Sequence, residues 1–251
     1  MTVALKTDHE IDLMRHAGKL LGQTLQQLTA AVRPGMTTWE LNKLGEDIIR
    51  GYGCIPSFLD YNGFPAAICI SVNDEVVHGI PRGDITIEEG DIVSLDAGLI
   101  YKGYHADAAR TVPVGNVSRQ AERLIKVTEE CFFEGMKYAV DGAHLYDISA
   151  AIAAHAKKNH YGVVRELTGH GIGKNLHEEP FIPNYRPFLR KGPKLEAGMT
   201  LAVEPMINEG SRHIYWKEDN WTVCTDDGSL SAHYENTILI TDGEPEILTL
   251  I

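Results

Sequence analysis

Two aspartates on one short hairpin constrain the fold of this chain more than any other feature. Asp96 and Asp107 lie in the strand-like segments 91–99 and 104–114, which the turn 101–103 joins. If the turn centres on its first two residues, the aspartates are directly opposite each other. If it centres on its last two, they are diagonal neighbours on the same face. In both registers, two carboxylates share one surface of an antiparallel sheet.

Two bare carboxylates repel each other by about 4 kcal/mol at a separation of about 4 Å in a protein-like dielectric. A metal ion would relieve this repulsion. So would an ion pair with Arg110, or a solvated face that screens the charges. Glu204 and Glu235 favour the metal. They lie in the apolar, strand-like runs 200–206 and 233–240, where an isolated charge is costly to bury. Four carboxylates on buried strands predict a site for divalent cations.

Composition limits the class of protein. The chain has 251 residues and a formal net charge of −12, which argues against a broad nucleic-acid-binding surface, so we expect no DNA partner. No apolar run approaches the roughly 20 residues of a membrane span, and the N-terminal residues lack the apolar stretch of a signal peptide. The cysteines form no Cys-x-x-Cys pair, which predicts reduced thiols. We therefore expect a cytoplasmic protein that does not bind membranes.

Capping signals and apolar spacing predict four helices in two pairs. Capping boxes at 7–10 and 37–40 start helices that end near residues 34 and 51. Two more helices are expected at about 120–138 and 145–160. Strands are expected at 69–72, at 76–79, in the hairpin, and from residues 163, 200, 223 and 234 onward. The segment 180–193, which has four prolines, is predicted to be the longest loop and to edge a pocket.

The order of two helices followed by strands occurs twice, which predicts an internal duplication. The segment 90–96 resembles 198–204, and similar matches link 32–35 with 140–142 and 52–53 with 161–162. We expect one catalytic domain, 1–251, with halves of roughly 7–115 and 116–251. Asp96 and Glu204 then occupy matching positions, and a pseudo-two-fold would bring both to a cleft between the halves. Chance similarity of two helix-helix-strand units is the alternative.

His170 is a candidate fifth ligand in the glycine-rich run 168–173. Alone it would be read as a turn residue, but the four carboxylates change that interpretation. Four oxygen ligands and one imidazole are too many and too hard for a structural zinc site. They suit Mn, Fe(II) or Co(II), with two ions that share carboxylates. Because such ions make hydroxide available near neutral pH, hydrolysis is the expected reaction class.

Other histidines flank these ligands. His78 and His177 can each donate a hydrogen bond to a tetrahedral intermediate or cap a turn, and their spacing does not decide between the two. His105 shares the strand face of Asp107 and is expected to support the ligands without binding the metal. The histidines on predicted helices are expected to be solvated: His9, His16, His144, His155 and His160.

The five ligands, in this order, and their surrounding motifs closely resemble type I methionine aminopeptidase. The motifs are Val-His-Gly-Ile-Pro at 77–81, Gly-His-Gly-Ile-Gly at 169–173, His-Glu-Glu-Pro at 177–180, Val-Glu-Pro-Met at 203–206 and Tyr-Glu-Asn-Thr at 234–237. The similarity spans nearly the whole chain. It implies the α+β pita-bread fold, with two pseudo-symmetric helix-helix-strand halves around a curved antiparallel sheet. It also implies removal of the initiator methionine from nascent polypeptides, with preference for a small second residue.

The resemblance also implies a role for each ligand. Asp96 would bind one metal, Asp107 and Glu235 would bridge both, and His170 and Glu204 would bind the other. The ions would be two divalent metals, Co, Mn or Fe(II), with Zn and Ni as alternatives.

Catalytic and pocket residues follow from the same motifs. Glu204 would handle the proton of the attacking water, His78 would contact the scissile amide, and His177 would stabilise the oxyanion. Together with His78 and His177, the methionine pocket would comprise Phe58, Tyr61, Phe64, Cys69, Leu176 and Trp221. Phe58 and Leu176 depart from the family, where Cys and Phe are frequent, and this reshapes the pocket.

A third departure lies beside the second aspartate. Residues 106–109 read Ala-Asp-Ala-Ala, where the family usually has Gly-Asp-Thr. The missing hydroxyl would remove a hydrogen bond that supports a ligand, an effect that can be worth about 10- to 100-fold in metal affinity. We therefore predict reduced metal affinity, which Ala108→Thr would partly restore.

Two other functions compete with this interpretation. A proline-specific peptidase such as prolidase belongs to the same superfamily, but such relatives usually carry a large domain before the first helix. A non-catalytic module that binds protein or RNA would be expected to lose ligands, and all five are present. We expect a monomer that acts on the N-termini of nascent polypeptides. The resemblance suggests ribosome contact, on which the net charge does not decide.

Overall fold

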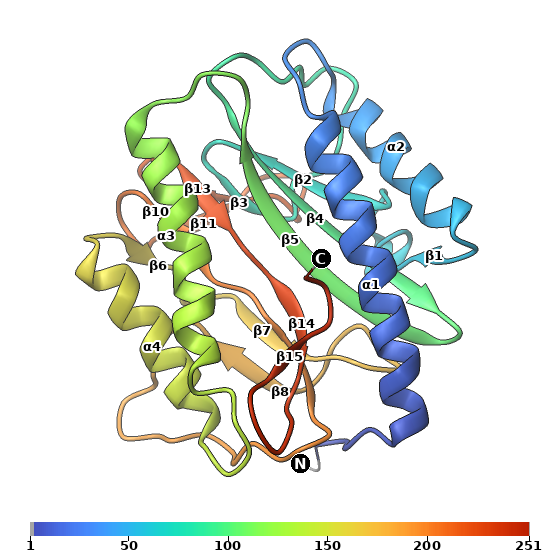
Figure 1. Ribbon diagram of the computed structural model, residues 1–251. Coiled ribbons are helices and arrows are strands. Elements are labelled where there is room, and N and C mark those ends of the chain that lie inside the picture. The colour runs from blue at the N-terminus through green and yellow to red at the C-terminus, as the bar shows by residue number, and fades with distance from the viewer. Residues whose placement is uncertain (1–2, 251) are drawn as a thin grey trace.

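Four helices pack along one side of a set of antiparallel strands in the computed structural model, which describes residues 3–250 (Figure 1). The helices are α1 (Asp8–Ala31), α2 (Thr38–Gly51), α3 (Arg119–Met136) and α4 (Leu145–Lys158), with a short 3-10 turn, η1 (Tyr61–Gly63). The four predicted helices are confirmed. In this range, no helix has the length and apolar character needed to cross a membrane. Residues 1, 2 and 251 of the predicted domain lie outside the described residues.

Both helices of the first half begin with the predicted capping box. The hydroxyl of Thr7 accepts the backbone N–H of Glu10, and the Glu10 carboxylate accepts the N–H of Thr7. Thr37 and Glu40 make the same reciprocal pair. These bonds satisfy N–H groups that a helix start leaves free, and so they fix where α1 and α2 begin.

The first half forms a four-stranded antiparallel sheet. Its strands are β1 (Ile55–Pro56), β2 (Ile68–Val72), β4 (Ile92–Tyr101) and β5 (Tyr104–Pro113), in the order β1-β4-β2, with β5 also paired to β4. In the β4–β5 hairpin, Asp96 pairs with Ala109 and Gly98 with Asp107. The two aspartates are therefore diagonal neighbours, because the turn centres on residues 102–103, which both have positive φ.

The second half forms a five-stranded antiparallel sheet in the order β15-β14-β9-β7-β8. Its strands are β7 (Thr168–Gly171), β8 (Glu178–Pro183), β9 (Thr200–Val203), β14 (Asn236–Leu239) and β15 (Glu246–Ile247). A three-stranded sheet comprises β6 (Gly162–Val163), β10 (Met206–Asn208) and β13 (Ser231–His233). Another comprises β3 (Glu75–Val77), β11 (Ile214–Trp216) and β12 (Val223–Thr225). Since β3 pairs with β12, this last sheet joins the two halves.

The prediction of a loop over 180–193 is wrong at its start. Residues 180–183 belong to β8, where Ile182 pairs with Gly169 of β7 and Pro183 with Thr168. Since β8 is an edge strand, its prolines need no ladder partner on their outer side. The remaining loop does not line the pocket described below.

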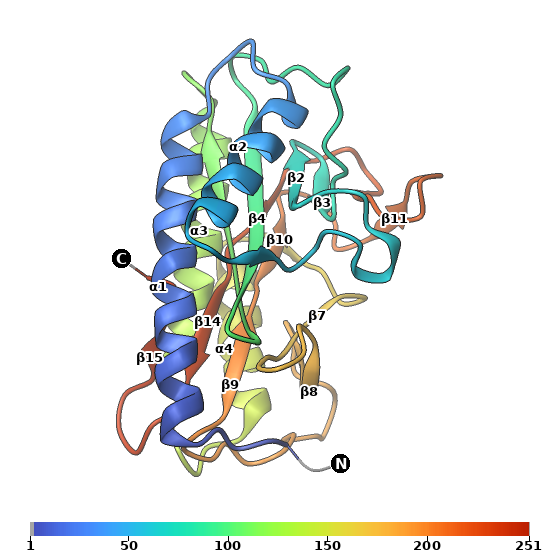
Figure 2. The ribbon, with the colours of Figure 1, turned by 90° about the vertical axis from the view of Figure 1, so that its right-hand side faces the viewer.

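Each half has its own apolar core between helices and strands. In the first half, α1 and α2 pack on β2, β4 and β5 around buried residues such as Leu28 and Leu95. In the second, α3 and α4 pack on β9, β10 and β14 around Phe132 and Leu201. Figure 2 shows α1 and α3 on one side of the central strands and β3, β7, β8 and β11 on the other.

Two histidines predicted to be solvated are not. His155 is half-buried, and its Nε2 lies 2.8 Å from the Glu130 carboxylate because α3 packs against α4. His144 precedes α4 and bonds the carbonyl of Gly192. The prediction is wrong for these two. The other three, His9, His16 and His160, are exposed.

Candidate metal centre

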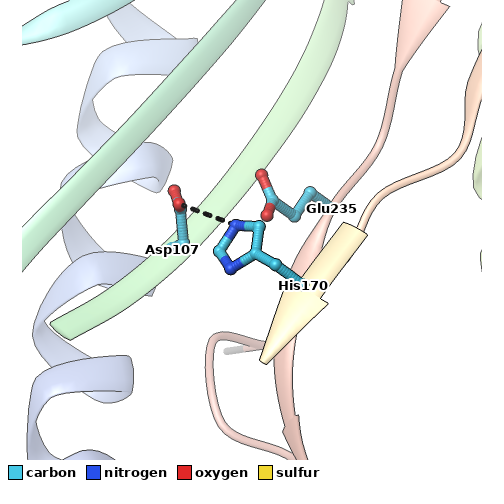
Figure 3. A group of neighbouring side chains, drawn as sticks. All are labelled: Asp107, His170 and Glu235. Atoms are coloured by element: carbon cyan, nitrogen blue, oxygen red, sulfur yellow. Dashed lines mark ion pairs between the residues drawn. The ribbon is translucent and has the colours of Figure 1, made fainter. Parts of the chain in front are cut away.

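Side chains from both halves meet in one pocket of about 180 Å³. The predicted ligands all line it: Asp96 on β4, Asp107 on β5, His170 on β7, Glu204 directly after β9 and Glu235 between β13 and β14. Ligand atoms of Asp107, His170 and Glu235 lie within 4.8 Å of one another (Figure 3). The structure therefore brings together residues that are up to 139 positions apart in the chain, since 235 minus 96 is 139.

A break in the second-half strands presents the two glutamates. β9 pairs with β14, and β10 pairs with β13 in the same antiparallel register, but the ladder stops between them. Glu204 and Glu235 lie opposite each other at this break. Pro205, which has no N–H to donate, follows Glu204. Both side chains line the pocket at this break.

The carboxylates are buried without compensation. Among residues 3–250, one oxygen each of Asp96, Asp107 and Glu235 is buried with no hydrogen-bond partner. Burial raises the pKa of Asp96 to about 7 and that of Glu204 to about 8. Burial first, and then neighbouring carboxylates, raise the pKa values of Asp107 and Glu235 well above the usual range. The pocket therefore lacks positive charge.

Arg110 does not supply that charge. Its guanidinium donates to the backbone carbonyls of Ala109 and Glu235 and to Oδ1 of Asn236, and it lies over the ring of Tyr234. Within the described part of the chain, the ion-pair partners of these carboxylates are histidines alone. Both alternatives to a metal fail, because the carboxylates are also too buried to form a solvated face. The hard oxygen donors and unpartnered oxygens fit divalent cations.

His170 is held in the tautomer that a metal requires. Its Nδ1 donates to the carbonyl of Gly171 at 2.8 Å, which leaves the Nε2 lone pair free. Nε2 lies 3.8 Å from Oδ2 of Asp107 and 3.8 Å from Oε1 of Glu204. Burial lowers the pKa of His170 to about 3, so the ring is neutral and able to bind a cation.

His177 lies against His170. Its ring centroid is 4.2 Å from that of His170, and its Nδ1 lies 2.7 Å from the phenolic oxygen of Tyr61. When the phenol donates this bond, Nε2 carries the proton. His177 then presents an N–H group as a donor.

His78 lines the same pocket from the end of β3. The predicted strand 76–79 ends early, because His78 has a φ of 58° and turns the chain. Gly79 follows where a Cβ would lie 2.2 Å from the carbonyl oxygen of Ile70, so no larger residue fits there. Burial lowers the pKa of His78 to about 4, and the ring is therefore neutral at physiological pH.

The predicted methionine-pocket residues line the cavity beside the acidic cluster: Phe58, Tyr61, Phe64, Cys69, Leu176 and Trp221. Phe64 and Trp221 meet edge to face with ring centroids 5.2 Å apart. The cavity therefore has an apolar part next to a strongly acidic part. This combination suits a small molecule with an unbranched apolar side chain and a positive charge.

Sequence reasoning missed two residues of the site and misplaced the bond of a third. Asn62 lines the pocket from η1, and nothing in the sequence pointed to it. His233 lies 3.6 Å from Glu204, and its position two residues before Glu235 on one strand run was the available signal. His105 bonds the hydroxyl of Ser57, not a carboxylate of the cluster.

The structure contradicts the premise of the Ala108 prediction. Ala108 is fully buried in the apolar core of the first half, together with Ala106, Leu21 and Leu95. Because successive side chains on a strand point to opposite faces, Ala108 points away from the face that carries Asp107. A hydroxyl at position 108 would face this core and not the metal centre.

Comparison with known proteins identifies the family. The sequence profile of metallopeptidase family M24 matches residues 12–242. The chain belongs to this family. It is 53% identical to the methionine aminopeptidase of Clostridium acetobutylicum over 99% of both chains. It is 47% identical to methionine aminopeptidase 1 of Bacillus subtilis over 99% of this chain and 100% of the other.

Solved structures agree with this assignment. The crystal structure of methionine aminopeptidase from Rickettsia prowazekii matches with a TM-score of 0.96 and 43% identity, over 99% of this chain and 100% of that chain. Xaa-Pro dipeptidase from Bacillus anthracis matches with a TM-score of 0.78 and 26% identity, over 98% of this chain and 61% of that chain. The predicted pita-bread fold is confirmed. The higher identity and coverage favour a methionine aminopeptidase over a proline-specific peptidase.

Without metal, the protein is expected to lose stability as the pH rises from about 7 to about 8.5. The folded state holds protons on Asp96 and Glu204 that the unfolded state, with pKa values of 3.8 and 4.5, has already released. Their stabilising effect is complete below the unfolded pKa values and is lost as the pH rises through the folded ones. Histidines, whose folded pKa values are lowered, contribute little in this window because they are neutral in both states.

Urea unfolding in a chelator at both pH values measures this change. Saturating Mn²⁺ is the control, because a bound cation replaces the protons and removes the loss. A free energy of unfolding that increases with pH in the chelator would contradict the uncompensated cluster.

We expect Ala108→Thr to leave the Co²⁺ affinity unchanged and to destabilise the protein by about 1–3 kcal/mol, because the core must accommodate extra atoms. Calorimetric titration with Co²⁺ and urea unfolding measure the two effects. Ala4→Thr, at an exposed position before α1, is the matched control. Tighter Co²⁺ binding in Ala108→Thr would restore the original interpretation of this position.

Proposed function

We propose that this protein is a methionine aminopeptidase that removes the initiator methionine from nascent polypeptides and prefers a small second residue. The observation that carries this proposal is the pocket in which a mainly aromatic apolar lining adjoins four carboxylates, three of them buried and that of Glu204 half-buried. The apolar part accommodates an unbranched thioether, and the acidic part attracts the α-ammonium group of a peptide N-terminus. Relatives named methionine aminopeptidase, 40–53% identical over 99% of this chain, support the same activity.

The site is proposed to hold two divalent ions, Co, Mn or Fe(II), with Zn and Ni as alternatives. Asp96 would bind one ion, His170 and Glu204 the other, and Asp107 and Glu235 both. When bound, such ions supply Lewis acidity and lower the pKa of water from 15.7 toward about 7. The unpartnered carboxylate oxygens and the free Nε2 of His170 support this assignment.

Protein groups perform the proton transfers and stabilise charge. Glu204 would accept a proton from the attacking water and return it to the leaving amine. His177, whose Nδ1 is engaged by Tyr61, would donate from Nε2 to the developing oxyanion. His78 is the candidate donor to the scissile amide.

The proposed substrate also suggests where the protein acts. Initiator methionine is removed from nascent chains, so we propose a cytoplasmic protein that works as a monomer close to the ribosome. We propose no DNA partner and no membrane partner. One domain with halves of roughly 7–115 and 116–251 carries the whole site.

A panel of short peptides tests this function. The purified protein with Mn²⁺ or Co²⁺ is expected to release methionine from Met-Ala-Ser but not from Met-Phe-Ser, because the resemblance to type I methionine aminopeptidase implies a preference for a small second residue. A chelator should abolish release, and added metal should restore it. Chromatographic detection of free methionine measures the reaction.

Two outcomes would contradict the proposal in different ways. Cleavage of an Xaa-Pro dipeptide without release from Met-Ala-Ser would indicate a proline-specific peptidase. A protein that binds metal and cleaves no peptide would indicate a binding module that has kept the fold.

A further inference from the structure

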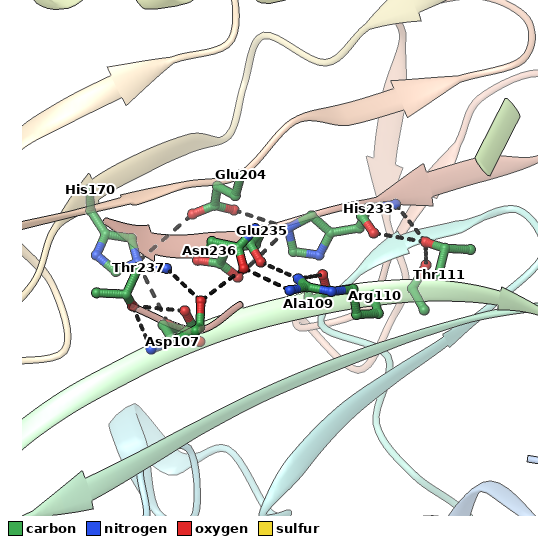
Figure 4. Close-up of polar contacts among 12 residues, drawn as sticks. Asp107, Ala109, Arg110, Thr111, His170, Glu204, His233, Glu235, Asn236 and Thr237 are labelled. Atoms are coloured by element: carbon green, nitrogen blue, oxygen red, sulfur yellow. Dashed lines mark hydrogen bonds and ion pairs between the residues drawn. The ribbon is translucent and has the colours of Figure 1, made fainter. Parts of the chain in front are cut away.

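The two halves meet around one reciprocal backbone pair. Ala109 and Glu235 exchange N–H and C=O bonds of 3.3 and 3.0 Å. On one side of this pair, the Thr111 hydroxyl bonds both the N–H and the C=O of His233, each at 2.8 Å. On the other side, the Thr237 hydroxyl bonds the N–H and the C=O of Asp107 at 2.9 and 2.8 Å. The seam is therefore symmetric in its bonding (Figure 4).

This symmetry makes His233 the counterpart of Asp107. The pairs Asp107–His233, Ala109–Glu235 and Thr111–Thr237 are all 126 positions apart, since 233 minus 107, 235 minus 109 and 237 minus 111 each give 126. The strand pairing supports the same match. Asp107 pairs with Gly98, and His233 pairs with Met206. Positions 98 and 206 are 108 apart, as are Asp96 and Glu204. The second half thus places an imidazole where the first half places a proposed metal-binding carboxylate.

The surroundings of His233 leave its ring without a hydrogen bond. The residue is 1% exposed, and neither ring nitrogen has a partner within the described residues. Its Nε2 lies 3.6 Å from Oε2 of Glu204 and 3.9 Å from Oε2 of Glu235. Burying a polar ring without a partner is unfavourable, which points to a role for His233 in the site.

Glu204 lies between two imidazoles. Its Oε1 is 3.8 Å from Nε2 of His170, and its Oε2 is 3.6 Å from Nε2 of His233 (Figure 4). The two rings differ in one respect. His170 donates from Nδ1 to a backbone carbonyl and so offers a lone pair at Nε2, whereas no carbonyl in residues 3–250 engages Nδ1 of His233.

We propose that His233 is a positioning residue of the metal centre: its Nε2–H holds Oε2 of Glu204, so that Oε1 stays on the His170 side of the pocket. A neutral imidazole has one N–H to donate. The 3.6 Å separation is longer than a hydrogen bond, so a small movement of either side chain has to close it when the site is filled. A fixed Glu204 then keeps one oxygen on the His170 side and the other on the His233 side. The inference rests on the metal site of the proposed function, but not on the identity of the peptide.

Two substitutions distinguish the positioning role of His233 from a role in packing alone. His233→Leu removes the donor, and His233→Gln keeps an N–H that can reach Glu204. Calorimetric titration of the metal-free protein with Co²⁺ is expected to show binding weakened by about 10- to 100-fold in His233→Leu. His233→Gln is expected to recover most of the affinity. The visible absorption spectrum of the Co²⁺ protein should change in His233→Leu and remain that of the unsubstituted protein in His233→Gln.

Controls make each outcome decisive. His155→Leu, on α4 and outside the pocket lining, should bind Co²⁺ like the unsubstituted protein. Urea unfolding of each metal-free variant shows whether it folds. Unchanged Co²⁺ affinity in folded His233→Leu, or an altered spectrum in folded His233→Gln, would overturn the positioning role. Because both readouts are independent of peptide cleavage, failure of the proposed aminopeptidase activity would be recognised separately.

Discussion

The structure depends on one electrostatic conflict: four carboxylates, three buried and one half-buried, lie close together without a lysine or arginine to neutralise them. Burial raises the pKa values of all four, and the only basic groups within ion-pair distance in the described chain are neutral imidazoles. Such a cluster is stable only with protons or cations. Divalent ions resolve the conflict at neutral pH and at the same time supply the chemistry of hydrolysis.

Contacts between the two halves of the fold hold this cluster in place. The acidic residues of the first half lie on a continuous hairpin, and those of the second lie at a break in the ladder. The reciprocal bonds between Ala109 and Glu235, with a threonine hydroxyl on either side, lock these two arrangements together. The site therefore forms only when both halves are folded. Figure 2 shows α1 and α3 on the side of the central strands opposite β3, β7, β8 and β11.

Local signals predicted much of the fold. Capping boxes located the starts of α1 and α2, because their bonds are made within four residues. The sequence left two registers for the β4–β5 hairpin, and the left-handed turn residues decide between them. β8 and the bond of His155 were missed because both depend on partners distant in the chain. The Ala108 prediction failed because a motif comparison says nothing about which face of a strand a residue occupies.

More of the candidate site than of the fold could be predicted from the sequence. A carboxylate in an apolar run is costly to bury, and few roles other than metal binding account for it. His233 was missed for a different reason. Its role depends on the pseudo-two-fold seam, which pairs it with Asp107 only once the halves are assembled. The same seam holds His233, whose proposed role is to position Glu204 in the metal site.

X-ray diffraction from crystals grown with Mn²⁺, recorded with the anomalous signal of manganese, shows whether the acidic cluster holds cations. We expect two anomalous peaks in the pocket, with carboxylate oxygens of Asp107 and Glu235 in contact with both ions. Clear density for the five side chains with no manganese among them, or with the carboxylates turned apart, would contradict it.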